Sequence, residues 1–292
     1  MSAAVTHPEA TWTRLVLSAV AMLASFAIME KMPEANVLVY GLGYAHYALG
    51  LKYSRRGVNS AWERPRAKAL LLGAFVTSFL LAGIPMVVSG IIVYFGIHHA
   101  ISEAYFQTDS PRVRTAHGAV VIGTYLSIIS SNLSFIPHLM ETGWVVTVLA
   151  ALALIVAVKA ESGKLDWSLT LRRFPWLTIG PAFLILAFWL PVDWRALTLF
   201  HFIFWGALPA LRPGLIKGRA LKTYWTETAL INAGCVALVL GLNLFGKNTS
   251  NQLPYFAMTQ LFFAWSYLHI TWSFIVSGAN PPWVKRLVGV AR

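Results

Sequence analysis

Long apolar blocks follow one another along almost the whole chain, and they constrain the fold more than any other feature. A helix of about 17–25 apolar residues crosses the hydrocarbon core of a bilayer. The blocks lack the alternation of outer-membrane strands and are too long for strands of a soluble core. We distinguish ten, at residues 14–30, 35–52, 67–84, 86–106, 115–132, 137–158, 174–191, 195–211, 226–245 and 255–277. We therefore predict an all-α polytopic membrane protein with about ten transmembrane helices, in a single domain over residues 1–292.

The composition agrees with a membrane location. Charged residues make up 12% of the 292 residues, about half the share found in typical soluble domains. The single cysteine, Cys235, excludes a disulfide framework and a metal site built from cysteines.

Lysine and arginine are distributed very unevenly over the predicted loops. All of them lie on one set of alternate loops and at the two termini, apart from Lys31, Arg195 and Lys247. Loops rich in Lys and Arg stay in the cytoplasm, so both termini are predicted to be cytoplasmic. The net charge of +12 then reflects orientation in a cell inner membrane, and we expect no nucleic-acid partner.

Four of the predicted spans place a histidine at a similar depth. Counted from the cytoplasmic ends, His46, His98, His201 and His269 lie roughly 9–15 Å below the membrane surface, at 1.5 Å per residue. Ionisable residues at such depth usually face the interior of a helix bundle. Because neutral imidazole is a common ligand of transition metals, we predict that these four side chains hold a metal ion.

Two alternative roles for the histidines stay open. They can be unrelated structural residues that bind neighbouring helices by hydrogen bonds, or they can line a proton or ion path. The metal boxes of zinc metalloproteases and of membrane desaturases do not occur in the chain.

The stretch "YFGIHHAISEAY" contains two adjacent histidines and a glutamate. His98 and His99 point about 100° apart on a helix, so His99 is a possible substitute ligand. Glu103 lies four residues after His99, on the same face. It can orient that imidazole from a second coordination layer, or it can reach interfacial water. His117, near the same depth in the next span, is the other expected second-layer residue.

Aromatic residues accompany these histidines in the sequence. They can pack in the core or face lipid, or they can line a tunnel for a long apolar ligand that enters from the membrane. The predicted tunnel residues are Tyr44, Tyr47, Tyr94, Phe95, Trp205, Trp265 and Tyr267.

Five segments, "GLGYAHYALG", "YFGIHHAISEAYF", "TAHGAVV", "LFHFIFW" and "YLHITWSFI", resemble in order the histidine segments of the bacterial Brp/Blh-type beta-carotene dioxygenases. The resemblance implies an integral membrane enzyme that uses iron and O₂ to cleave beta-carotene into two retinals. The positions that match functional histidines or an acidic residue of that family are His46, His98, Glu103, His117, His201 and His269.

The chain departs from the family pattern at two positions. Gly50 stands where the first segment has Asp, and Trp205 stands where the fourth segment has a second histidine. The resemblance thus favours an iron-dependent membrane oxygenase over beta-carotene in particular.

The expected function is that of a non-haem Fe(II) oxygenase in the bilayer, acting with O₂ on a carotenoid or a related lipophilic polyene. One alternative is an oxygenase or desaturase for a fatty-acyl or isoprenoid substrate. Another is a haem-binding or transport protein without enzymatic activity.

Overall fold

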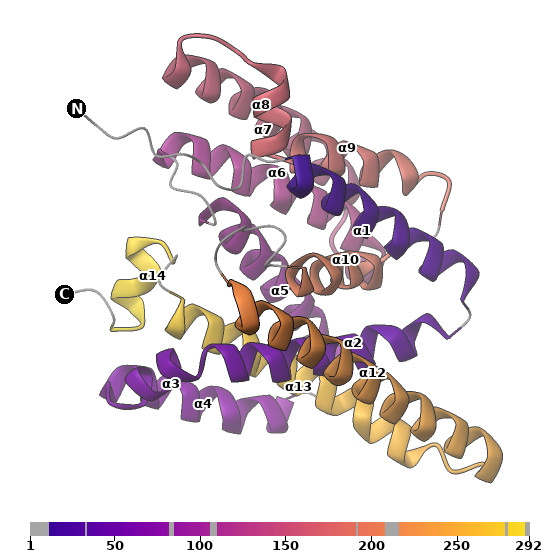
Figure 1. The fold of residues 1–292 in the computed structure, drawn as a ribbon. Helices are drawn as coiled ribbons and strands as arrows, with labels where there is room; N and C mark the ends of the chain where they lie inside the picture. Colours follow the sequence, from indigo (N-terminus) through magenta and orange to yellow (C-terminus); the bar gives the residue numbers. More distant parts are fainter. Residues whose placement is uncertain are drawn as a thin grey trace. The chain divides into compact units, whose positions relative to one another are not determined.

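The computed structural model describes residues 12–32, 34–81, 85–105, 110–190, 192–207, 216–277 and 280–289. Every regular element in these ranges is a helix (Figure 1), which confirms the all-α prediction. The chain forms two compact units, each built from two separate stretches. The first unit combines Met1–Pro33 with His99–Leu221, and the second combines Glu34–His98 with Lys222–Arg292. The boundary between them falls between His98 and His99.

Within the described residues, the first unit contains six α-helices and the C-terminal end of α5 (Pro85–Tyr105). The six are α1 (Trp12–Lys31), α6 (Pro111–Ile129), α7 (Leu139–Ser162), α8 (Trp167–Arg173), α9 (Trp176–Leu186) and α10 (Trp194–Gly206). Helices α6 and α7 lie side by side (Figure 1). A Cβ atom on Gly123 would lie 2.6 Å from the backbone nitrogen of Thr147. Glycine is therefore required where the two backbones meet, as in other close helix pairs of membrane proteins.

Two helices of this unit begin at recognisable caps. The Ser110 hydroxyl accepts a hydrogen bond from the Val113 amide, and Pro111 occupies the first turn of α6. The Asp166 carboxylate accepts one from the Leu169 amide at 3.0 Å and starts α8. Such side chains satisfy amide groups that the helix itself leaves unpaired.

Within the described residues, the second unit contains six α-helices, of which α12 belongs to it from Lys222 on, and the N-terminal part of α5. The six are α2 (Ala35–Tyr53), α3 (Arg55–Trp62), α4 (Pro65–Leu81), α12 (Gly218–Thr249), α13 (Leu253–Val276) and α14 (Pro282–Leu287). Helix α13 packs against both α2 and α4. Helix α2 also packs closely against α12 at Gly41. A Cβ on this glycine would lie 2.7 Å from the Cα of Val236.

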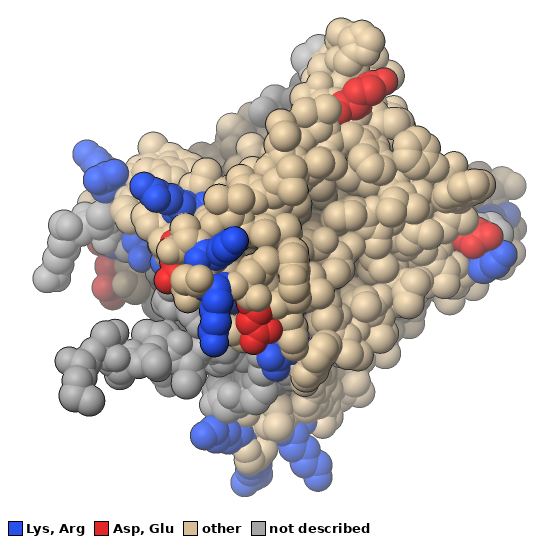
Figure 2. Space-filling view, turned by 90° about the horizontal axis from the view of Figure 1, so that it is seen from above, with Lys and Arg blue, Asp and Glu red and all other residues tan. Residues whose placement is uncertain are grey.

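Three helices in the described ranges, α1, α7 and α12, are long and apolar enough to cross a membrane. Large apolar side chains stand exposed on them, for example Leu149 and Leu230, and most of the surface in Figure 2 is neither acidic nor basic. The chain is therefore a membrane protein. Helix α9 is shorter than the predicted block 174–191, with 11 residues and a proline at Pro181; it spans only about 16 Å.

Candidate functional site

Three of the predicted metal ligands come together in the second unit. His46 lies on α2, His98 on α5 and His269 on α13. The ring centres of His46 and His269 are 4.8 Å apart, and those of His98 and His269 are 6.1 Å apart. We call these three residues the histidine triad. Three helices that are distant in sequence thus contribute one imidazole each to the same place.

A glycine makes room for the triad. Gly50 follows His46 by about one turn of α2, and a Cβ built on it would lie 3.0 Å from Cε1 of His269. A larger side chain at this position would press on the His269 ring. The resembling family has Asp at this position. In this chain the position is a glycine, which leaves space for the imidazole of His269.

Aromatic rings surround the triad. Tyr47 packs on His269 with ring centres 5.0 Å apart, and its hydroxyl shares a hydrogen bond of 2.5 Å with Ser266. Phe274 meets His98 at 5.6 Å, edge to face. The imidazoles are therefore held in an apolar setting, as expected for a dry site inside a bundle.

The triad fits a transition metal ion in the chemistry of its donors and in part of its spacing. As they are placed, no three His, Cys, Asp or Glu side chains within the described ranges are arranged to hold an ion. Imidazoles nevertheless suit iron, zinc and copper. Two imidazoles bound to one ion at about 2.1 Å have ring centres roughly 5 Å apart. The His46–His269 pair has that spacing, whereas His98 lies farther from His269.

An apolar groove of about 570 Å³ lies between α4, α5 and α13, in the same unit. Two predicted tunnel residues, Tyr94 and Tyr267, line it. Their rings are 5.7 Å apart, and the Tyr94 hydroxyl shares a hydrogen bond of 3.2 Å with Thr271. Tyr94 and His98 both contact Phe274 at 5.6 Å. One lining residue of the groove, Tyr94, thus shares an aromatic neighbour with His98.

The remaining predicted tunnel residues lie elsewhere. Tyr44 donates a hydrogen bond of 2.6 Å to the carbonyl of Met258, and Tyr47 packs on the triad. Phe95 and Trp265 are half-buried and do not belong to the described lining of the groove. Trp205 lies in the first unit, where its ring is 6.1 Å from that of His201.

His201, the fourth predicted ligand, belongs to the first unit and is buried there. Its ring centre is 4.9 Å from that of His99. Both rings contact aromatic side chains: Phe202 for His201, and Trp176 for His99 at 5.2 Å. The two adjacent histidines of α5 are therefore assigned to different groups, His98 to the triad and His99 to His201.

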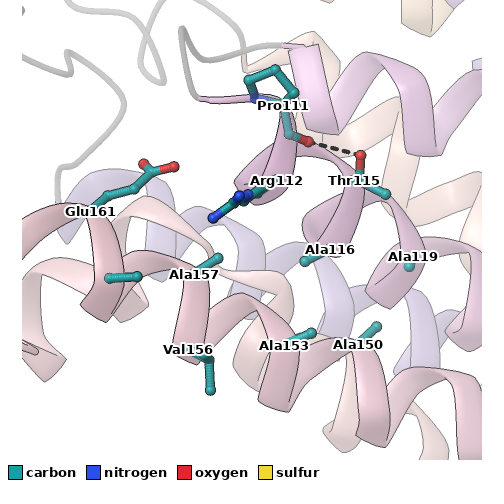
Figure 3. Close-up of a pocket in the computed structure, with 11 residues that line it drawn as sticks. Pro111, Arg112, Thr115, Ala116, Ala119, Ala150, Ala153, Val156, Ala157 and Glu161 are labelled. Atoms are coloured by element: carbon teal, nitrogen blue, oxygen red, sulfur yellow. Dashed lines mark hydrogen bonds between the residues drawn. The ribbon is translucent and has the colours of Figure 1, made fainter.

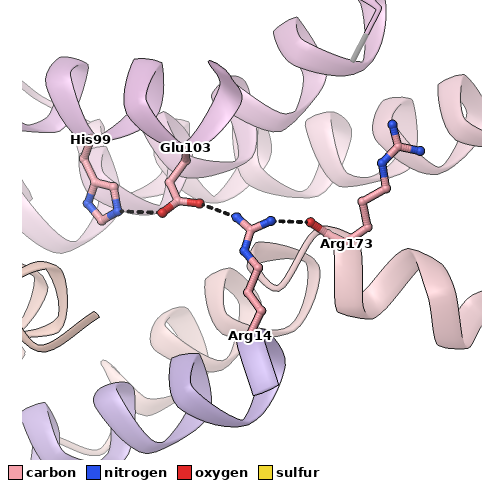
Figure 4. A network of polar contacts seen from close by, with 4 residues as sticks. All are labelled: Arg14, His99, Glu103 and Arg173. Carbon is pink, nitrogen blue, oxygen red and sulfur yellow. Dashed lines mark hydrogen bonds and ion pairs between the residues drawn. The ribbon is translucent and has the colours of Figure 1, made fainter. Parts of the chain in front are cut away.

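Both ring nitrogens of His99 face polar partners. Nδ1 is hydrogen-bonded to the Tyr125 hydroxyl, and Nε2 lies 3.7 Å from Oε1 of Glu103 (Figure 4). The tautomer that carries its proton on Nε2 satisfies both contacts, because the tyrosine then donates to Nδ1. This arrangement disfavours His99 as a metal ligand, and it leaves His98 as the better candidate on this helix.

Glu103 is held by a buried arginine that sequence reasoning counted only as a terminal charge. Arg14 donates 2.9 Å to Oε2 of Glu103 and 2.8 Å to the carbonyl of Arg173, at the end of α8 (Figure 4). Arg14 is 0% exposed and Glu103 is 1% exposed. The carboxylate therefore pairs with Arg14 and faces His99, and it does not reach interfacial water. The sequence contained one indication of this ion pair: a single Arg begins one apolar block, and a single Glu lies near the end of another.

His117 lies in α6 of the same unit, fully buried against Phe174 at 5.2 Å. Among the described residues, neither of its ring nitrogens has a hydrogen-bond partner. Both expected second-layer residues, His117 and Glu103, thus belong to the first unit and not to the unit of the histidine triad.

A second groove, of about 770 Å³, runs between α6 and α7 (Figure 3). Arg112 and Glu161 stand at one end, and alanines line most of the remainder. No histidine belongs to its described lining.

Comparison of the chain with models of protein families, with curated proteins and with solved structures finds no match. The functional assignment therefore depends on the histidines and on their surroundings.

Proposed function

We propose that the chain is a membrane-embedded non-haem iron oxygenase that cleaves a carotenoid or a related polyene with O₂. The observation that carries the proposal is the histidine triad, with its ring-centre distances of 4.8 and 6.1 Å. The proposed ligands are His46, His98 and His269, the three predicted ligands that lie in one unit. The proposal includes ten membrane spans in a cell inner membrane, with both termini cytoplasmic.

Neutral imidazoles contribute no charge, so an Fe(II) ion held by them stays cationic and keeps open positions. When bound, the iron would supply the binding and activation of O₂. The protein would provide the ligands and a setting without water. Gly50 leaves the space that the His269 ring needs.

The groove beside His98 is the proposed binding place for the polyene. Tyr94 and Tyr267 line it, and the remaining lining is mostly small or apolar. An elongated apolar ligand lying along the groove would bring part of its chain near His98, because Tyr94 precedes that residue by one helical turn. The tyrosines would orient the ligand and exclude water.

The Arg14–Glu103–His99 contacts have a positioning role in this proposal. They fix the rotation of α5 about its own axis, since His99 and Glu103 lie on one face of it. His98 is carried on the same helix, about 100° away from His99. Holding one face of α5 therefore sets the direction in which His98 points.

A related function, oxidation or desaturation of a fatty-acyl or isoprenoid chain, is the second candidate. The groove favours it as much as the polyene, because Tyr94, Tyr267 and small apolar residues accept any elongated hydrocarbon.

The test is expression of the full chain in a bacterium that accumulates carotenoids, followed by metal analysis of the purified protein. We expect loss of pigment with formation of retinal or another apocarotenoid. His269→Ala should abolish it. The matched control is His138→Asn, because His138 has a φ of 55°, which Asn tolerates.

Unchanged pigment with iron bound to the protein would favour the fatty-acyl or isoprenoid substrate. Protein purified from iron-replete medium without any metal would contradict both oxygenase functions. A Soret band in the absorption spectrum would show a haem protein instead.

A further inference from the structure

Six basic side chains gather at one end of the second unit, where α3, α4 and α14 meet. We call them the basic surface: Arg55, Arg64, Arg66, Lys68, Lys285 and Arg286. In the described ranges, none of the six forms an ion pair with Asp or Glu. Nearby Lys52 is different, because Glu227 neutralises it at 2.6 Å. The basic surface therefore keeps its charge.

A compact apolar cluster holds the basic surface in place. It joins α3, α4, α13 and α14 through the buried residues Ala61, Ala67, Leu71, Ile275, Val284 and Val288. The stem of Arg66 lies over the end of α14, 3.2 Å from the position of a Cβ on Gly289. Since the three short segments are packed on one core, the backbone positions that carry these cations are fixed relative to one another. Like charges held together in this way favour an anionic ligand.

Arg64 has a buried hydrogen-bond donor that a ligand of the basic surface could pair with. Its Nε donates 3.2 Å to the carbonyl of Ser60, yet its Nη1 is buried without an acceptor among the described residues. Buried donors in folded proteins are almost always paired. A guanidinium matches the oxygens of a phosphate group, which accept two parallel hydrogen bonds.

Aromatic side chains mark the level of the basic surface in the membrane. Tyr53, Trp62 and Trp283 are about half exposed around it, and Lys68 lies over the Trp62 ring at 5.1 Å. Partly exposed Trp and Tyr are typical of the membrane–water interface. Helices α2 and α13, which lead into α3 and α14, belong to segments expected to cross the bilayer. Phosphate at this level is that of lipid headgroups.

We propose that the basic surface is a binding site for the phosphate of an anionic phospholipid. Groups of Lys and Arg beside a membrane helix attract anionic lipids of the adjoining leaflet. The segments that carry the cations are packed on one core, Nη1 of Arg64 is buried, and aromatic side chains surround the surface. Together these features favour a specific site over a nonspecific excess of charge. The site is independent of the proposed oxygenase activity.

The test measures lipid retained by the full-length, delipidated protein in mixed micelles, by mass spectrometry after gel filtration. Phosphatidylglycerol, phosphatidylcholine and inorganic phosphate are offered separately. We expect retention of phosphatidylglycerol alone. The variant Arg64→Gln/Lys68→Gln/Lys285→Gln/Arg286→Gln should weaken it about tenfold or more, because each basic residue near a membrane surface adds to the attraction.

The control removes the same number of charges elsewhere, in Lys159→Gln/Lys164→Gln/Lys217→Gln/Lys222→Gln, and should keep wild-type retention. Equal loss in the two variants would overturn the proposal, because attraction by net charge alone would explain it. Displacement of the lipid by millimolar inorganic phosphate would also overturn it, by showing a site for free anions. An unchanged melting temperature shows that the fourfold variant is folded.

Discussion

The two units both gather histidines among aromatic rings, but they differ in the polar partners that they provide. His46 and His269 in the second unit are half-buried, next to a glycine and aromatic rings. His99 in the first unit is completely buried, between a tyrosine hydroxyl and a carboxylate that an arginine holds. A histidine whose two nitrogens face such polar partners serves the fold, whereas imidazoles that converge from three helices among aromatic rings suit a ligand. The difference separates even two adjacent histidines on one helix.

The largest effect is expected from breaking the buried ion pair of the first unit. Arg14→Ala leaves the Glu103 carboxylate buried without its cation, which lowers the free energy of unfolding by about 3–5 kcal/mol. Denaturation of the purified protein in micelles measures it. Arg14→Met/Glu103→Gln, which removes both charges, should recover part of the loss.

Lys31→Ala is the matched control, because Lys31 is exposed and pairs with exposed Glu30; surface changes of this kind are usually small. If Arg14→Ala were no less stable than this control, the first unit would not depend on its polar network.

The next largest effect is expected on Fe(II) affinity, which should depend on the triad and not on His99. His269→Ala removes a proposed ligand, and we expect the Fe(II) affinity to fall more than about 100-fold, beyond the loss typical of second-layer residues. His99→Ala should keep the affinity within about tenfold while lowering stability. Equilibrium dialysis with elemental analysis measures both. The reverse pattern would place the metal with His99 and remove the distinction between the units.

The three triad residues could be predicted from the sequence, because the depth of a residue in the membrane follows from its distance to the end of its predicted helix. His46, His98 and His269 lie at similar distances from the predicted helix ends, and the structure brings these three together. The same counting could not choose between His98 and His99, because neighbours on a helix share one depth. That choice depends on how α5 is rotated about its own axis, which counting residues does not give.

The short helices between the apolar blocks are not predicted by apolar periodicity. Helix α8 begins at the Asp166 cap, outside the apolar blocks from which the helices were predicted. Helix α3 is eight residues of mostly polar character, and it is stable where it is because its Ala61 packs into the cluster of α4, α13 and α14. Tertiary contacts of that kind cannot be deduced from one sequence.

Gly50 offers a finer way to disturb the triad alone. Gly50→Val places side-chain atoms against His269, whose Cε1 is only 3.0 Å from a Cβ at position 50. We expect a loss of about 1–3 kcal/mol in stability through overpacking, together with weaker iron binding. Gly234→Val is the control, since nothing lies within 4 Å of a Cβ there. Iron binding that is equally strong in both variants would show that the His269 ring position is unimportant.

The smallest expected effect concerns a single hydroxyl of the first unit. Tyr125→Phe removes the hydrogen bond to Nδ1 of His99 and keeps the ring that packs beside Trp176. Loss of one buried hydrogen bond lowers the free energy of unfolding by about 1 kcal/mol or somewhat more. Iron affinity should stay at the wild-type value, because His99 is not one of the proposed ligands. A fall in iron affinity as large as that of His269→Ala would mean that the network of the first unit reaches the metal directly, and the two groups of histidines would then form one site.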